Sequence, residues 1–227
     1  MNVKKVIGIV GGGQLGKMIA IAAAKYGKET HIFASSNDDP ACCVASHLTI
    51  ADFSNENALK AFAQSVDLVT VESENVPCDA IDIISQYTDF YPGREALYVS
   101  QNRLREKDFI RGLGVKTTYY KAIQCYDDLL KNSNYPIRLK TIEMGYDGKG
   151  QYVIQDHCQL SSLKWDTHYI LESNVDLLKE ISVVVARDKC GKVEFFPIAE
   201  NYHINGILDT SRVPAQISDS LVKETQQ

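Results

Sequence analysis

A glycine-rich turn near the N-terminus constrains the fold of this 227-residue chain more than any other feature. It runs Gly-Gly-Gly-Gln-Leu-Gly from Gly11 to Gly16, directly after a β-branched run over residues 3–10. Apolar residues spaced as on one face of a helix follow between Gln14 and Tyr26. A strand, a tight turn and a helix in this order are typical of the first unit of a parallel α/β sheet. The pattern predicts a Rossmann-like domain whose first turn is a binding site for an anion, a binding site for a dinucleotide or a plain structural turn.

The dinucleotide alternative requires an acidic residue about 20 positions after the turn, at the end of the second strand, to bind ribose hydroxyls. The second predicted strand covers residues 30–34 and is followed by Ser35, so Ala34 and Ser35 stand where the carboxylate is needed. This counts against an NAD-linked oxidoreductase. An anion site of another kind and a structural turn stay open.

Alternating β and α patterns continue to about residue 90. A helix is expected around residues 58–62 and a third strand over residues 68–71, which predicts a parallel sheet. Tyr91-Pro92-Gly93 breaks the pattern, and Ser100 is expected to cap a helix that contains Arg103. We therefore expect two domains, 1–98 and 99–227. Strands are expected in the second at 119–123, 137–141, 152–154, 169–172, 181–187 and 194–198, with helices at 126–132, near 160 and from 217, so this half is α+β.

Composition narrows the functional classes. Lys and Arg total 24 against 29 Asp and Glu, a net charge of −5, and no basic run offers the stripe that nucleic acid binding needs. Six cysteines without a C-x-x-C pair predict free thiols. The first apolar run is too short for a signal sequence or a membrane span, so we expect a cytoplasmic protein with no membrane partner.

A second glycine-rich segment carries a lysine at the end of a strand. Lys140 ends the expected strand, and Gly145, Gly148 and Gly150 follow before the next strand begins. Such a loop can fold over a triphosphate and donate N–H groups, while the lysine supplies charge to phosphate oxygens. The alternative is a hairpin with a flexible polar turn.

Carboxylates at strand ends are further candidates. Glu172 and Glu180 sit at strand edges, where they could accept hydrogen bonds from ribose hydroxyls or adenine, or simply be solvated. Glu72 and Glu74 follow the third strand at the end where parallel sheets bind ligands. His203, taken alone, is more often a structural or exposed histidine. No Ser-His-Asp, Cys-His or His-x-x-x-His grouping supports acyl-enzyme or zinc hydrolase chemistry.

The two glycine motifs together resemble one family. Gly-Gly-Gly-Gln-Leu-Gly-Lys-Met at 11–18, paired with Gly-Tyr-Asp-Gly-Lys-Gly-Gln at 145–151, is similar to the 5-(carboxyamino)imidazole ribonucleotide synthases, ATP-grasp ligases of purine biosynthesis. Glu-Asn-Val-Pro at 74–77, the segment 101–107, Lys-Glu-Ile-Ser at 179–182 and Glu-Asn-Tyr-His at 200–203 support this resemblance. It implies a preATP-grasp Rossmann-like domain followed by an α+β ATP-grasp domain that lacks its C-terminal part.

The resemblance also implies a reaction and its residues. ATP and Mg²⁺ would serve the carboxylation of aminoimidazole ribonucleotide by bicarbonate, through carboxyphosphate, and the implied assembly is a homodimer. The implied catalytic residues are Tyr146, Asp147 and Lys149, and those for the ribonucleotide are Gln14, Leu15 and Glu74. The implied ATP-binding residues are Arg103, Lys140, Gly145, Tyr146, Asp147, Gly148, Lys149, Gly150, Gln151, Glu172, Ser173, Asn174, Val175, Glu180 and His203.

The sequence departs from the family pattern at three places: Met144 replaces a glycine, Ser73 replaces an aromatic residue, and Ala34-Ser35 replaces an acidic turn. The family's segment Asn-Glu-Leu-Ala-Pro-Arg, which holds Mg²⁺, is not in the sequence, so no metal ligand is assigned. A nucleotide-binding remnant without catalysis is therefore the alternative to a working ligase.

Overall fold

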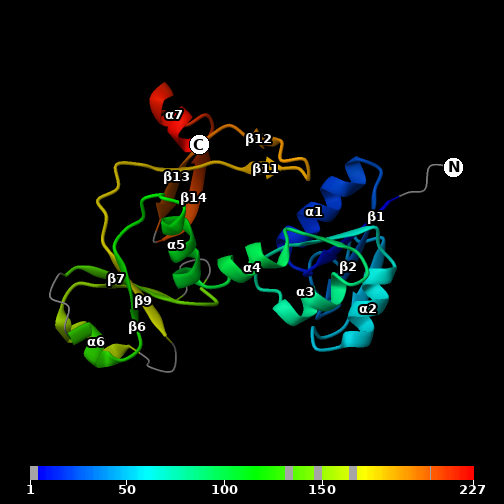
Figure 1. The fold of residues 1–227 in the computed structure, drawn as a ribbon, viewed down its shortest axis with the longest axis horizontal. Helices are drawn as coiled ribbons and strands as arrows, with labels where there is room; N and C mark the ends of the chain where they lie inside the picture. Colours follow the sequence, from blue (N-terminus) through cyan, green and yellow to red (C-terminus); the bar gives the residue numbers. More distant parts are fainter. Residues whose placement is uncertain (1–4, 131–134, 146–149, 164–167, 205) are drawn as a thin grey trace. The chain divides into compact units, whose positions relative to one another are not determined.

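The computed structural model describes residues 5–130, 135–145, 150–163, 168–204 and 206–227. The chain divides into two compact units, Met1–Thr117 and Thr118–Gln227 (Figure 1). The first unit thus extends past residue 98, where the sequence placed the domain boundary. It does so because the helix α5 (Arg103–Gly112) packs on α4 (Arg94–Ser100): the guanidinium of Arg105 lies 3.9 Å from the ring centroid of Tyr98, and its Nε donates to the Tyr98 carbonyl.

The first unit is a parallel sheet with helices on both faces. Its strands are β1 (Val6–Val10), β2 (Glu29–Ala34), β3 (His47–Ile50), β4 (Leu68–Val71) and β5 (Asp89–Tyr91), in the order β3-β2-β1-β4-β5. The helices α1 (Gln14–Lys25), α2 (Glu56–Gln64) and α3 (Cys78–Ile84) connect them (Figure 1). The predicted Rossmann-like domain is confirmed.

Alternation along the central strands explains the two-sided core. Val10 pairs with Phe33, and both lie in one buried cluster with residues of α2 and α3. Ile9 pairs with Ile32, and both lie in a second cluster with Ala20 of α1. Successive side chains of a strand point to opposite faces, so each face of the sheet buries its own set.

Two local expectations for this unit are corrected. Ser100 does not cap the next helix; it is the last residue of α4, and its hydroxyl donates to the Leu97 carbonyl. The cap of α5 is Asn102, whose Oδ1 accepts hydrogen bonds from the backbone N–H groups of Leu104 and Arg105, each at 3.1 Å. The edge strand β3 was not foreseen, because its half-exposed residues carry no clear apolar alternation.

The second unit contains a four-stranded antiparallel sheet. The strands β6 (Tyr120–Ile123), β7 (Ile137–Thr141), β8 (Gln151–Ile154) and β9 (Tyr169–Ser173) lie in the order β6-β9-β7-β8. Two short helices, α6 (Tyr126–Leu130) and the 3₁₀ helix η1 (His157–Ser162), cover one face, where Leu129 and Leu160 are buried with Leu139 and Leu171. The strands are those that the sequence predicted here.

The same unit has a smaller sheet and a hairpin. The smaller sheet consists of β10 (Glu180–Ser182), β13 (Ala199–Ile204) and β14 (Ile207–Arg212). The hairpin consists of β11 (Val185–Arg187) and β12 (Val193–Phe195). The helix α7 (Asp219–Thr225) follows β14. The single strand expected at 181–187 is therefore two strands, because Ile181 pairs with Glu200 and Val185 with Phe195. The mixed α/β then antiparallel architecture agrees with the predicted fold class. Within the part of the chain that is described, no helix has the length and apolar character needed to span a membrane.

Candidate functional site

A cavity of about 440 Å³ lies in the second unit. Residues from the larger sheet, from the segment that follows β9 and from the smaller sheet line it. They are Thr118, Arg138, Lys140, Gln151, Glu172, Ser173, Val175, Leu177, Glu180, His203 and Gly206. Charged groups of both signs are thus collected around one space.

Lys140 and Glu172 form an ion pair on the wall made by β7 and β9. Lys140 Nζ lies 2.8 Å from Glu172 Oε2, and the two side chains are 21% and 7% exposed. The antiparallel register places Arg138 opposite Glu172 and Lys140 opposite Ile170, so the lysine reaches diagonally to the carboxylate. An ammonium has three donors. Glu172 therefore fixes the position of Lys140 and leaves it the capacity to donate to a ligand.

Arg138 is a cavity residue that the sequence reasoning missed. Ile137 and Leu139 are buried in the core, so Arg138 and Lys140 share the opposite face of β7. Arg138 Nε donates to Asn174 Oδ1 at 2.9 Å. The strand alternation was visible in the sequence and would have found Arg138. Two cations on one strand face suit a ligand with several negative charges.

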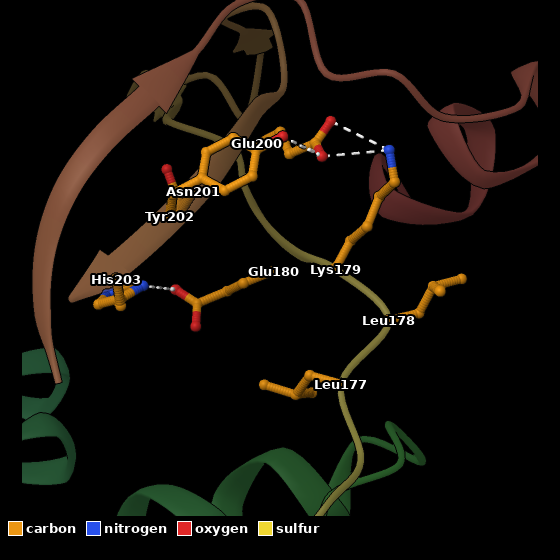
Figure 2. A pocket seen from close by; sticks show the side chains of 8 residues that line it. All are labelled: Leu177, Leu178, Lys179, Glu180, Glu200, Asn201, Tyr202 and His203. Atoms are coloured by element: carbon orange, nitrogen blue, oxygen red, sulfur yellow. Dashed lines mark hydrogen bonds and ion pairs between the residues drawn. The ribbon is translucent and has the colours of Figure 1, made fainter. Parts of the chain in front are cut away.

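Glu180 and His203 face each other from neighbouring strands of the smaller sheet. His203 Nδ1 lies 3.5 Å from Glu180 Oε1 (Figure 2). Both side chains are partly exposed and both line the cavity, where a carboxylate accepts and an imidazole can donate or accept hydrogen bonds.

A second cavity of about 330 Å³ adjoins the first, and Leu177, Glu180 and His203 line both. One of its residues is the buried Glu200, which is 4% exposed. Tyr202 Oη donates to Glu200 Oε1 at 2.7 Å, and Lys179 Nζ lies 3.1 Å from the same oxygen (Figure 2). The Gln216 backbone amide donates to Glu200 Oε2 at 3.1 Å. These hydrogen bonds, from Tyr202 first, then from the Gln216 amide and Lys179, lower the pKa of the Glu200 carboxyl to about 2.

The structure brings many of the predicted ATP-binding residues to one place. Lys140, Gln151, Glu172, Ser173, Val175, Glu180 and His203 line the same cavity. Asn174 accepts a hydrogen bond from Arg138, which lines the cavity. The Gly150 carbonyl accepts a hydrogen bond from the Thr141 amide at 2.7 Å. Gly145 ends the described stretch before the loop. Tyr146, Asp147, Gly148 and Lys149, including all three predicted catalytic residues, lie outside the described residues.

Other predicted residues belong to the first unit. Arg103 is the first residue of α5. Gln14 and Leu15 begin α1 and are exposed, and Glu74 lies in the segment after β4, where its carbonyl accepts from Gln101 Nε2 at 2.7 Å. Their roles stay predictions.

The carboxylate of Glu72 occupies the glycine turn of the first unit. Its Oε1 accepts from the Gly13 N–H at 2.9 Å and its Oε2 from the Gly16 N–H at 2.8 Å. Glu72 reaches the turn because β4 pairs directly with β1, Val71 opposite Val10, so the residue after β4 lies beside Gly11. Sequence reasoning noted Glu72 but could not place it, because the contact depends on strand order.

Metal ligands are not gathered in the part of the chain that is described: no group of three or more His, Cys, Asp or Glu side chains there is arranged to hold an ion. The cations, carboxylates and hydroxyls that line the cavity suit a polar ligand with phosphate groups.

Comparison with known families agrees with both units. Residues 4–101 match the ribonucleotide synthetase preATP-grasp domain, and residues 108–227 match the ATP-grasp domain. The chain belongs to the ATP-grasp family. Lys140 and the cavity that it lines are thus parts of an ATP-grasp domain.

Three of the proteins similar to this chain are N5-carboxyaminoimidazole ribonucleotide synthases or synthetases. The N5-carboxyaminoimidazole ribonucleotide synthase of Brucella melitensis biotype 1 is 38% identical, over 93% of this chain and 61% of that protein. A crystal structure of an N5-carboxyaminoimidazole ribonucleotide synthetase as an ADP complex superposes with a TM-score of 0.92 at 35% identity, over 98% of this chain and 60% of that one. The Staphylococcus aureus synthetase complexed with ADP gives 0.90 at 32% identity, over 99% and 62%. The chain spans about three-fifths of the length of these relatives.

Proposed function

We propose that this chain binds ATP in the cavity of its second unit and is the nucleotide-binding part of an ATP-dependent carbon–nitrogen ligase. The observation that carries the proposal is the wall formed by Arg138 and Lys140, with Glu172 and Glu180 at the same cavity. The ADP complexes of two similar synthetases support a nucleotide as the ligand.

The cations account for the phosphate end of the ligand. Lys140 is partly buried and held by Glu172, so it loses little side-chain freedom when a phosphate oxygen approaches. Arg138 offers a planar set of donors beside it. Both charges would attract a polyphosphate more strongly than they would a neutral ligand, because the cavity walls reduce solvent screening.

The carboxylates account for the nucleoside end. Glu172 and Glu180 are acceptors only, which suits ribose hydroxyls and the exocyclic amine of adenine. Val175 and Leu177 add apolar surface at the cavity for a planar base. We place His203, beside Glu180, at the polar part of the ligand.

The reaction follows from the resemblance to the synthases. An oxygen of bicarbonate would attack the γ-phosphorus of ATP, giving ADP and carboxyphosphate. The amine of aminoimidazole ribonucleotide would then attack the carboxyl carbon and lose a proton to solvent, and phosphate would leave with the pair of electrons from the broken C–O bond. In such phosphoryl transfer, positioning and charge neutralisation supply most of the rate. Gln14, Leu15 and Glu74 for the ribonucleotide, and Tyr146, Asp147 and Lys149 for catalysis, are part of this proposal.

Mg²⁺ would neutralise phosphate charge in this reaction. Because the described residues provide no grouped metal ligands, we assign it no ligand and derive no step through it. The alternative is a nucleotide-binding chain that does not catalyse the reaction alone. A cytoplasmic location and a homodimer are also part of the proposal.

Nucleotide selectivity tests the proposal. Calorimetric titration of the chain with ATP, ADP and NADH should show saturable binding of the two adenine nucleotides and none of NADH. Saturable binding of NADH, with no heat from ATP, would overturn it.

A further inference from the structure

The glycine turn of the first unit has an anion built into it. In dinucleotide-binding folds the N–H groups at such a turn bind a phosphate of the ligand. Here the N–H groups of Gly13 and Gly16 donate to the two carboxylate oxygens of Glu72 instead. The Gly11 N–H is also used, because it donates to the Phe33 carbonyl at 2.9 Å.

The glycines are matched to this carboxylate. A Cβ on Gly13 would lie 2.7 Å from Glu72 Oε1, and one on Gly16 would lie 2.6 Å from the Gly11 carbonyl oxygen and 3.0 Å from Glu72 Oε2. Gly11, at a φ of +112°, would place a Cβ against the same side chain. The first turn of α1 has no acidic residue of its own, so Glu72 supplies the negative charge that a helix N-terminus favours.

We propose that Glu72 is a specificity-determining residue that closes the Gly11–Gly16 turn to phosphate. The side chains of Gln14 and Leu15, and not the N–H groups of the turn, are then the groups that contact a ligand at this place. Both side chains are exposed at the start of α1. A ribonucleotide that contacts this turn would then have its phosphate bound by other groups. That consequence rests on the proposed function; the closure of the turn does not.

The Glu72 carboxylate competes well with a free phosphate for the N–H groups of Gly13 and Gly16. A carboxylate tethered to β4 competes with a free phosphate at a high effective concentration, and it makes two charge-assisted hydrogen bonds. A phosphate would have to displace it and leave the carboxylate beside a second anion. The wild-type turn should therefore exclude phosphate at millimolar concentrations.

Amide resonances of Gly13 and Gly16 provide a direct test that needs neither ATP nor activity. In the full chain, we expect these two resonances to stay unchanged when inorganic phosphate or formate is added at constant ionic strength. In Glu72→Ala, which removes the carboxylate, both resonances should shift saturably with either anion. Formate should also raise the Tm of this variant by about 2–4 °C, because an anion that binds the folded protein but not the unfolded chain stabilises the fold.

Two further variants complete the experiment. Glu72→Gln keeps the shape but replaces an acceptor with a donor, so its Tm should fall below wild type and formate should not restore it. Glu95→Ala removes an exposed carboxylate of the same unit and should behave as wild type. Should Glu72→Ala fail to fold without added anion, folding on addition of formate supports the proposal equally. Saturable shifts of Gly13 and Gly16 by phosphate in the wild-type chain, or a Glu72→Ala variant that folds yet responds to neither anion, would overturn it.

Discussion

Lys140 Nζ and Glu172 Oε2 lie 2.8 Å apart on adjacent antiparallel strands, with both side chains mostly shielded from solvent. A second ion pair in the same unit, Lys192 with Glu194, has the same 2.8 Å separation but is about 70% exposed at both ends. The two pairs have the same separation but differ in their exposure to solvent. Solvent screening should make the first pair count for stability and the second contribute little.

We predict that Glu172→Gln lowers the free energy of unfolding by about 1–2 kcal/mol, because Lys140 loses its charged partner in a shielded site. The matched variant Glu194→Gln should change it by less than about 0.5 kcal/mol. Urea unfolding followed by circular dichroism measures both changes. Equal losses in the two variants would mean that shielding does not distinguish the pairs.

Glu200 should make the second unit sensitive to acid. Its folded pKa is lowered from 4.5 to about 2, so its stabilising contribution is fully present above pH 4.5 and is lost as the pH falls toward 2. The Tm of Glu200→Gln should therefore be lower than that of wild type at pH 6, and this difference should shrink between pH 4.5 and pH 2.

Tyr202→Phe tests the cause of that lowered pKa. It removes the hydrogen bond that contributes most, so the folded pKa of Glu200 should rise toward 4.5 and the acid loss of Tm should begin at higher pH. An unchanged pH profile in this variant would show that Tyr202 does not set the pKa.

The glycine turn should tolerate substitution poorly. Gly11→Ala combines an unfavourable positive φ with a collision against Glu72, and we expect a loss of about 2–4 kcal/mol in unfolding free energy. Gly27→Ala is the control: its φ is +66°, and no heavy atom lies within 4 Å of the added Cβ, so about 1 kcal/mol is expected. Similar Tm values for the two variants would contradict the close approach of Glu72.

The sequence predicted most elements whose residues alternate or repeat with a clear period. The strands β1, β2 and β4 and the helix α1 follow from apolar periodicity, because each buries one side in the core. β13 and β14 were not predicted. Most of their residues are exposed, so no apolar pattern marks them.

Site residues were predictable where a motif or resemblance named them, and otherwise only in part. Lys140, Glu172 and His203 were named from the sequence, and the structure places them around one cavity. The bond from Glu72 to Gly13 and Gly16 spans more than 50 residues and depends on β4 lying next to β1. A single sequence contains no signal for that pairing. The sequence could therefore predict an anion site at the glycine turn, but not that the Glu72 carboxylate occupies it.

The central claim is that the cavity beside Lys140 binds ATP, and calorimetric titration of ATP into matched lysine variants tests it most directly. Lys140→Ala should weaken ATP binding at least about tenfold, corresponding to about 1.4 kcal/mol, because a shielded cation at the phosphates is lost. Lys192→Ala, which removes an exposed lysine of the same unit, should leave the affinity unchanged. Both variants should keep a cooperative unfolding transition, so that a lost fold is not mistaken for lost binding. If folded Lys140→Ala bound ATP as tightly as wild type, the cavity would not be the nucleotide site.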